Sequence, residues 1–394
     1  MIKRELGHKI KSLLKSFPIV AVIGPRQSGK TTLLKNLFPK RNYVSLEDLD
    51  NRNFAEQDPH GFLDTYKPPV IFDELQKAPK LFSYLQTRVD TIGKIGQYLL
   101  SGSQNFFLME KISQSLAGRV GILTLLPLSI KELKESRLNK NNIEEAMFTG
   151  FYPRIFDKKI KPYDWYSNYI QTYLERDIRQ IKNISDLSLF QRFLKLCAGR
   201  TGQLLNLSSL GNDCGVSHNT VRSWISILET SYIIYLLQPY HKNYNKRLIK
   251  SPKLYFYDIG LACSLLGIEN KEQLATHPLR GSLFETMVIA ELIKYRFNKG
   301  QKSNTYFFRD KSGHEVDLLI DTDKLTLACE IKSGKTISED FFTNLNYWQT
   351  IAKAKITKST KSFIIYGGDK KQQRLHASII GWQEVHEMYR SNFM

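Results

Sequence analysis

The sequence predicts an α/β protein whose amino-terminal part is built around a buried parallel sheet. Short apolar runs alternate with helical patterns over residues 1–150, and polar residues or glycine follow the runs. The runs are Ile19–Ile23, Tyr43–Ser45, Val70–Phe72, Tyr98–Leu100 and Ile122–Leu126. Runs that are apolar on both faces and are separated by helices are typical of a parallel sheet covered on both sides.

Length and composition indicate more than one domain. The chain has 394 residues, of which 42% are hydrophobic and 24% are charged, as in ordinary globular proteins. Residues 151–280 are helical in pattern and rich in aromatic and basic side chains, whereas residues 281–394 return to mixed helix and strand. We therefore expect three parts: an α/β domain over 1–150, a helical region over 151–280 and a second α/β domain over 281–394.

The charge and the cysteines restrict the cellular setting. The net charge of +19 favours a polyanionic partner, although solvated surface lysines are the commoner explanation of a diffuse excess. The four cysteines, Cys197, Cys214, Cys263 and Cys329, lie far apart, which is typical of buried thiols in a reducing compartment. No apolar run reaches the ~18 residues of a membrane span. We expect a cytoplasmic protein that does not associate with a membrane.

The first apolar run leads into a phosphate-binding loop. The residues are Gly24, Pro25, Arg26, Gln27, Ser28, Gly29, Lys30 and Thr31, and they fit the Walker A pattern GxxxxGK[ST] between a strand and a helix. Glycines let the backbone wrap around phosphates, and the helix that follows turns its positive end toward them. Lys30 is expected to reach the β- and γ-phosphates of ATP. Thr31 is expected to ligate Mg²⁺, with Thr32 beside it.

An acidic pair follows the third apolar run. Asp73 and Glu74 come directly after Val70–Phe72. Asp73 is placed as a Walker B residue that holds Mg²⁺, and Glu74 is placed to polarise the attacking water. The alternative, an exposed acidic turn, is disfavoured by the Walker A loop upstream.

Two further residues are candidates for contact with the nucleotide. Ser103 follows the fourth run, where a polar side chain would lie near the γ-phosphate. Arg119 follows Ala117 and Gly118, and its guanidinium would stabilise transition-state charge within its own subunit or in a neighbouring one. The alternative for Arg119 is a surface salt bridge.

Together these segments resemble the AAA-type ATPases. The resemblance is carried by the Walker A loop, PPVIFDELQK, LLSGSQ, the AGR motif and LLPLSIKEL. More narrowly, the chain is similar to a group of bacterial and archaeal ATPases in which an AAA domain is fused to a helical, winged-helix and nuclease-like carboxy-terminal region. The turn Thr149–Pro153 and the helix Tyr169–Asp177 are similar to that group, although Thr149 stands where the group often has glycine. The resemblance makes Arg176 a second candidate nucleotide-sensing arginine, with a local surface pair as the alternative.

The middle of the chain resembles a winged helix–turn–helix. A helix opening at Leu204–Leu210 is followed by a turn with Gly215 and by a second helix, His218–Thr230, capped by Ser217. Strands over 231–237 and 254–257 would form the wing. His218, Asn219, Thr220 and Arg222 would face a DNA major groove, and a basic stretch of Lys242, Lys246, Arg247, Lys250 and Lys253 would hold phosphate. The alternative is a packing module, because the second helix carries one arginine and no lysine.

Four residues of the last part fit the pattern of PD-(D/E)xK nucleases. Asp317 and Glu330 would hold a divalent metal, Lys332 would position water, and Glu285 on the helix Gly281–Phe297 would complete the metal shell. His314 precedes Glu315 where the motif usually has proline before its first acid. The alternatives are an ordinary amphipathic strand edge and a nuclease-like fold kept for binding alone.

Three functions remain open at this level. The first is an Mg²⁺-dependent ATPase that couples its nucleotide state to DNA engagement by the carboxy-terminal half. The second is a nucleotide-switched signalling module with a protein partner, and the third is an ATP-gated, metal-dependent nuclease. The sequence decides neither the partner nor the oligomeric state.

Overall fold

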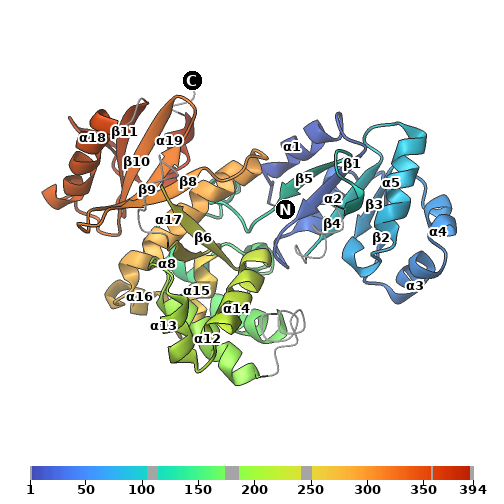
Figure 1. Ribbon diagram of the computed structural model, residues 1–394, viewed down its shortest axis with the longest axis horizontal. Coiled ribbons are helices and arrows are strands. Elements are labelled where there is room, and N and C mark those ends of the chain that lie inside the picture. The colour runs from blue at the N-terminus through green and yellow to red at the C-terminus, as the bar shows by residue number, and fades with distance from the viewer. Residues whose placement is uncertain (1, 104–113, 174–185, 241–250, 356–357, 391–394) are drawn as a thin grey trace.

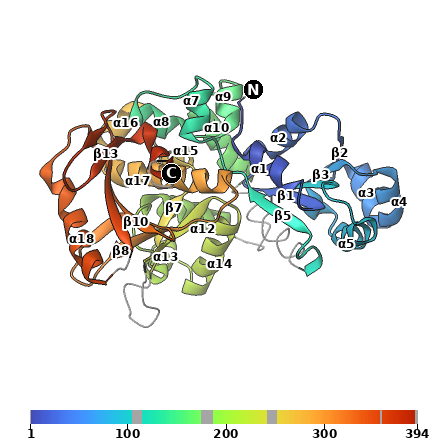
Figure 2. The same cartoon turned by 90° about the horizontal axis from the view of Figure 1, so that it is seen from above.

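The computed structural model describes residues 2–103, 114–173, 186–240, 251–355 and 358–390. Figure 1 shows the amino-terminal sheet on one side, the carboxy-terminal sheet on the other and the middle helices below them. The long helix α17 (Arg280–Asn298) runs between the two sheets, and Figure 2 shows the same arrangement from above. None of the helices in the described part of the chain combines the length and apolarity that a bilayer span needs.

The amino-terminal sheet has five parallel strands in the order β2-β3-β4-β1-β5. The strands are β1 (Ile19–Ile23), β2 (Asn42–Ser45), β3 (Val70–Asp73), β4 (Tyr98–Gly102) and β5 (Val120–Thr124). The predicted parallel α/β sheet is therefore confirmed, with β5 starting two residues earlier than its apolar run. Since β4 lies between β1 and β3, the carboxyl ends of these three strands meet at one edge of the sheet.

Helices cover both faces of this sheet. They are α1 (Leu6–Leu13), α2 (Lys30–Leu37), α3 (Leu49–Gln57), α4 (Pro59–Thr65) and α5 (Leu81–Ile92), with a 3-10 turn η1 (Leu75–Lys77) after β3. Leucines and isoleucines of α1 and α2 pack on one face, against Val20 and Val22, whereas α4 and α5 pack on the other, against Phe72 and Tyr98. This coverage explains why every residue of β1 is buried.

The middle region is helical and leads into a hairpin. Its helices are α7 (Ile130–Glu135), α8 (Ile143–Thr149), α9 (Pro153–Asp157), α10 (Pro162–Tyr169), α12 (Leu187–Gly199), α13 (Leu207–Cys214), α14 (His218–Thr230), α15 (Ile259–Leu265) and α16 (Lys271–Thr276). Gly215, at a φ of 78°, ends α13, and the Ser217 hydroxyl caps α14 by accepting from Thr220 N at 3.1 Å. The strands β6 (Ile234–Pro239) and β7 (Lys253–Phe256) follow as an antiparallel pair.

The hairpin β6–β7 forms one edge of the carboxy-terminal sheet. This eight-stranded sheet has the order β12-β13-β11-β10-β9-β8-β6-β7, and β6 pairs parallel to β8 at Gln238 and Tyr306. The other strands are β8 (Thr305–Arg309), β9 (Glu315–Asp321), β10 (Leu325–Lys332), β11 (Ser359–Tyr366), β12 (Gln372–Gln373) and β13 (Ser378–Gly381). The remaining elements are η3 (Glu339–Phe342), α18 (Thr343–Lys355), η4 (Trp382–Glu384) and α19 (Glu387–Arg390). The expected wing is thus an integral part of the second α/β unit.

A buried carboxylate joins the turn after α8 to the middle helices. Asp258 accepts hydrogen bonds from Phe151 N at 2.8 Å, from the Tyr166 hydroxyl at 2.6 Å and from Leu261 N at 3.1 Å. Burial raises the pKa of Asp258 above its ordinary value, although these donors and Lys294 oppose the shift. The turn itself needs glycine, since a Cβ on Gly150 would lie 1.9 Å from the Tyr166 hydroxyl.

Asp258→Ala is expected to lower the free energy of unfolding by at least about 3 kcal/mol, because three buried donors lose their acceptor. Urea denaturation of the full chain measures the change. Asp64→Ala is the matched control: its carboxylate is mostly exposed and pairs with Arg88 on the surface, so the change should stay within about 1 kcal/mol. Equal effects of the two substitutions would contradict this account of Asp258.

Candidate functional site

The loop between β1 and α2 has a backbone that only glycine allows at two positions. Gly24 has a φ of 147°, and a Cβ there would lie 2.2 Å from the Leu125 carbonyl oxygen. Gly29 has a φ of 92° and starts α2. The loop therefore packs closely against the end of β5 and delivers its last residues to the amino terminus of α2, where anions are favoured.

Lys30 lies buried in this loop with 5% of its surface exposed. Its ammonium donates to the carbonyl oxygens of Gly24 at 3.0 Å and Pro25 at 2.8 Å. Burial lowers the pKa of Lys30 to about 8, against the opposing effect of Glu74 and Asp73. The side chain is therefore a desolvated cation placed within its own loop, ready to exchange carbonyl oxygens for stronger acceptors.

Asp73, the last residue of β3, accepts from hydroxyl groups of three other elements. Thr31 Oγ1 donates to Oδ2 at 2.8 Å, the Tyr43 hydroxyl donates to the same oxygen at 2.7 Å, and Ser101 Oγ donates to Oδ1. Burial and Asp73 raise the pKa of Tyr43 above its ordinary value. The two residues expected to hold Mg²⁺ are thus in direct contact and offer the hard oxygen atoms that this ion takes.

Glu74 lies at the same edge of the sheet in a left-handed conformation, with a φ of 55°. Its Oε2 accepts from Ser103 Oγ at 2.9 Å, from Ser103 N at 3.2 Å and from the Gln76 amide. These bonds hold the carboxylate in one orientation between the ends of β3 and β4. Ser103, expected near a phosphate, contacts Glu74 directly.

A cavity of about 530 Å³ opens beside these groups, a size in the ordinary range for small-molecule sites. From the predicted site it is lined by Arg26, Gln27, Gly29, Lys30, Thr31, Thr32 and Glu74. Its other walls include the apolar Ile2, Leu33, Leu128 and Pro153, the basic Arg4, Arg154 and Lys158, and the acidic Glu47 and Asp157. No sequence motif indicates that Ile2, Leu128, Pro153, Arg154 and Lys158 line the cavity, because they belong to segments outside the loop.

Arg4 joins the loop to the segment that follows β5. Its guanidinium donates to the carbonyl oxygens of Ser28 at 2.7 Å and Leu126 at 2.6 Å, and it pairs with Glu132 at 3.1 Å. Both charged groups are buried, and Glu132 also forms a capping box with Ser129 at the start of α7. Arg4 therefore supports the backbone of the loop from behind, a role that no sequence motif indicates.

The expectation that Arg119 lies near the γ-phosphate of its own chain is wrong. Arg119 precedes β5 at the amino end of the strand, and it forms two bonds to Asp90, at 2.6 and 2.8 Å. Five residues of β5 separate it from the edge where Lys30 lies, about 16 Å at the usual rise of a strand. The surface ion pair is what the structure contains. Arg176, the second candidate, lies outside the described residues.

The four carboxy-terminal candidates lie close enough to interact electrostatically, but they do not form a metal site. Asp317 accepts from Ile331 N at 2.8 Å, and Glu330 pairs with Lys332 at 2.7 Å. Across the described ranges, no group of three His, Cys, Asp or Glu side chains is placed to hold a metal ion. The prediction that Glu285, Asp317 and Glu330 share one metal is therefore not met.

A lysine of the β6–β7 hairpin explains why these acids do not form a metal site, because its ammonium lies among them. Lys253, at the start of β7, has 4% of its surface exposed and lies 3.5 Å from Glu285 Oε1. It also pairs with Glu315, and the Tyr255 hydroxyl donates to Glu285. Burial would lower the pKa of Lys253, but Glu285, Asp317 and Glu315 more than offset this and raise it. Lys253 was expected to hold phosphate on an exposed wing, and that expectation is wrong.

Two acids of this region, Glu285 and Glu330, have pKa values raised above their ordinary range. Burial raises the pKa of Glu285 to about 7, although Lys253 opposes the shift. Burial and the neighbouring Asp317 raise the pKa of Glu330 to about 8. The ammonium of Lys253 thus provides a positive charge beside Glu285 and Glu315 and favours their ionised forms. The other basic residues expected in the wing, Lys242, Lys246, Arg247 and Lys250, lie outside the described residues.

Comparison with known families defines the class of the first domain. A family model described as an AAA domain matches residues 16–134. Two domains of unknown function, DUF8612 and DUF4143, match residues 140–272 and 280–385. Together with the parallel sheet and the loop geometry, the match shows that the chain carries an AAA-type P-loop ATPase domain.

Individual relatives span most of the chain. Uncharacterized proteins of Mycobacterium bovis and Mycobacterium tuberculosis are each 28% identical over 339 residues, which cover 85% of this chain and 75% of the relative. One of Methanocaldococcus jannaschii is 23% identical over 420 residues, covering 93% of this chain and 84% of the relative. Among solved structures, the Walker-type ATPase of Pyrococcus abyssi matches with a TM-score of 0.47 and 15% identity, over 67% of this chain and 96% of that one.

Lys253→Met is expected to lower the free energy of unfolding by about 3–5 kcal/mol, because it leaves Glu285 and Glu315 without their buried cation. Adding Glu285→Gln to this variant should restore part of the loss, as measured by urea denaturation. Lys134→Met, which breaks a largely exposed pair with Glu384, is the control and should change stability by less than about 1 kcal/mol. A Lys253→Met protein as stable as this control would show that Lys253 does not hold the acids together.

Proposed function

We propose that the protein is an Mg²⁺-dependent ATPase whose nucleotide state is transmitted to its carboxy-terminal half. The observation that carries the proposal is the gathering of Lys30, Thr31, Asp73 and Glu74 at one edge of a parallel sheet, beside a cavity of about 530 Å³. Phosphoryl transfer needs little beyond positioning and electrostatic stabilisation, and these four side chains are of the types that supply both.

Each residue has a role that its surroundings support. Lys30 would exchange its two carbonyl partners for oxygens of the β- and γ-phosphates, where its ammonium binds more strongly. Thr31 and Asp73 would hold Mg²⁺, which when bound neutralises charge on the phosphates. Glu74, oriented by Ser103 and Gln76, would accept a proton from the attacking water.

One side of the cavity is apolar and could hold the adenine base of the nucleotide. Ile2, Leu128 and Pro153 line the cavity from three separate segments, and Arg154 and Lys158 stand at the same cavity. Flat aromatic ligands bury well against such side chains. We assign these three residues to the adenine and the two basic ones to the phosphate or ribose side.

Transmission to the carboxy-terminal half is supported by the contacts of α17. Glu291 accepts from Ile130 N at 2.6 Å, and Lys294 donates to the Leu128 carbonyl oxygen at 2.9 Å and to Glu291 at 2.6 Å. Lys294 also lies 4.0 Å from the centre of the Phe151 ring. One helix therefore contacts two of the three segments that supply the apolar wall of the cavity, those of Leu128 and Pro153.

The same helix reaches the acidic cluster around Lys253. Glu285 lies nine residues before Lys294 on α17, about 13 Å away along the helix axis. If nucleotide binding displaces the cavity wall, α17 would move as a rigid body. This movement would change the position of Glu285 relative to Lys253. This contiguous path supports coupling between ATP and the carboxy-terminal half.

The partner of the carboxy-terminal half is proposed to be DNA, with a protein as the alternative. Asn219 and Arg222 are exposed on α14, the helix that the sequence predicts to face a DNA groove. Burial of Lys253 in the acidic cluster removes one of the cations expected to hold phosphate, and the acids do not fit a metal centre. We therefore propose binding without cleavage, and a steep salt dependence of retention would separate DNA from a protein partner.

Glu74→Gln is expected to lower the rate of ATP hydrolysis by about 10²- to 10⁴-fold while ATP affinity changes little, because the loss falls on proton transfer alone. Phosphate release under single-turnover conditions measures the rate, and calorimetry measures the affinity. Glu47→Gln is the matched control, since Glu47 is an exposed acid that lines the same cavity. A Glu74→Gln enzyme as fast as this control would refute the role given to Glu74.

Affinity for the ATP analogue should fall as pH rises above about 8. Below this pH Lys30 is charged with or without ligand, whereas above it the ligand-free side chain is neutral and must take up a proton to pair with phosphate. The dissociation constant should then rise up to about tenfold per pH unit. Calorimetric titrations between pH 7 and 9.5 test this, and Lys30→Met should abolish the dependence. A flat profile in the wild type would contradict it.

A further inference from the structure

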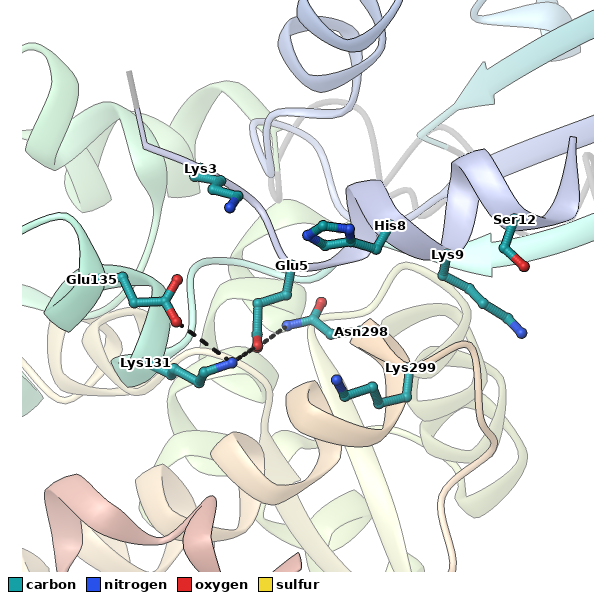
Figure 3. A pocket seen from close by; sticks show the side chains of 9 residues that line it. All are labelled: Lys3, Glu5, His8, Lys9, Ser12, Lys131, Glu135, Asn298 and Lys299. Carbon is teal, nitrogen blue, oxygen red and sulfur yellow. Dashed lines mark hydrogen bonds and ion pairs between the residues drawn. The ribbon is translucent and has the colours of Figure 1, made fainter. Parts of the chain in front are cut away.

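A second cleft, of about 420 Å³, lies where α1, α7 and the carboxyl end of α17 meet (Figure 3). It is separate from the nucleotide cavity and is lined mainly by basic side chains. These are Lys3, His8, Lys9, Lys131 and Lys299. Three segments that lie far apart in the sequence thus contribute cations to one concave surface.

The acids of the cleft are already paired with one of these lysines. Lys131 forms ion pairs with Glu5 and, at 3.6 Å, with Glu135, and Figure 3 shows all three side chains turned toward one another. Asn298 also points to Glu5, at 3.5 Å. The two carboxylates of the cleft are therefore directed at Lys131 and away from the other cations.

Three lysines of the cleft are left without a carboxylate. No ion pair formed by the described residues involves Lys3, Lys9 or Lys299. They come from the segment before α1, from α1 and from the residue that follows α17, so no single flexible loop brings them together. Like charges held in one cleft repel, and a multiply charged anion would relieve this repulsion. His8 and the Ser12 hydroxyl offer further donors.

The cleft shares a wall with the nucleotide cavity. Ile2 and Arg4 line the nucleotide cavity, whereas Lys3 and Glu5 line the cleft, so successive side chains of one segment face opposite spaces. Arg4 in turn holds the Ser28 carbonyl of the P-loop. An anion bound to Lys3 would therefore contact the segment that supports the P-loop from behind.

We propose that this cleft binds the phosphate groups of a polyanionic ligand, supplied either by a nucleic-acid backbone or by a small polyphosphorylated molecule. Lysine ammonium groups bind phosphate as point charges, without the fixed geometry that an arginine imposes. Binding here involves no residue of the P-loop. Any effect of the ligand on nucleotide affinity rests on the proposed ATP binding, whereas binding itself does not.

The test compares two triple variants that lose the same charge. One carries Lys3→Ala, Lys9→Ala and Lys299→Ala, and the control carries alanine at the exposed lysines 40, 311 and 324, outside the cleft. The first probe is a fluorescent single-stranded oligonucleotide, followed by anisotropy at several salt concentrations. The second is inorganic tripolyphosphate, followed by calorimetry with an Mg²⁺-bound, non-hydrolysable ATP analogue present in excess. Both variants keep Lys30, so failure of nucleotide binding leaves the comparison intact.

With the oligonucleotide, the cleft variant should lose about 2 from the slope of log affinity against log salt, and the control should lose less. That result assigns the ligand to nucleic acid. Loss of tripolyphosphate binding in the cleft variant alone assigns it to a small polyphosphate. Equal behaviour of the two variants with both probes, or no binding of either probe by the wild type, would overturn the proposal. Thermal unfolding checks folding, and the single exposed substitution Lys299→Glu gives the same comparison should the triple variant unfold.

Discussion

The carboxylate of Asp73 is the point on which the candidate site depends. A buried charge is tolerated only where hydrogen bonds satisfy it, and Asp73 obtains them from hydroxyl groups on α2, β2 and β4. The order of the strands makes this possible, because β3 lies between β2 and β4 and its last residue reaches both. Thr31 is thereby placed beside Asp73 before any ligand arrives. A site of this kind is preorganised, since few groups must move when a phosphate and its metal bind.

Buried cations connect the parts of the molecule. Arg4 connects the start of the chain to the P-loop through the Ser28 carbonyl oxygen. Lys253 connects the β6–β7 hairpin to α17 and β9 through Glu285 and Glu315. Lys294 connects α17 to the segment after β5 through the Leu128 carbonyl oxygen. Each of these cations is buried among carbonyl oxygens or carboxylates of the protein, so its charge is not available to bind an external partner. The net charge of +19 therefore overstates the charge available to a polyanion. The lysines of the second cleft that form no ion pair among the described residues are stronger evidence for such a ligand than the total charge.

The sequence predicts those features that short segments determine. The P-loop, the acidic pair and the parallel strands follow from local patterns, and α14 begins and ends where its cap and apolar spacing indicate. The position of Arg119 does not follow from its motif, because a motif does not reveal at which end of a strand a side chain lies. Glu285 and Glu330 both interact with Asp317, but Lys253 reaches these acids from a hairpin that the sequence assigns to another domain. Ile2, Leu128 and Pro153 meet only through tertiary packing, which no local pattern reports.

The most direct test of the central claim is calorimetric titration of the wild type and of Lys30→Met with an Mg²⁺-bound, non-hydrolysable ATP analogue. The account predicts one site per chain in the wild type and a dissociation constant about 10- to 100-fold higher in the variant, the loss expected when a charge-assisted bond to phosphate is removed. Equal affinities, or no binding to the wild type, would contradict it.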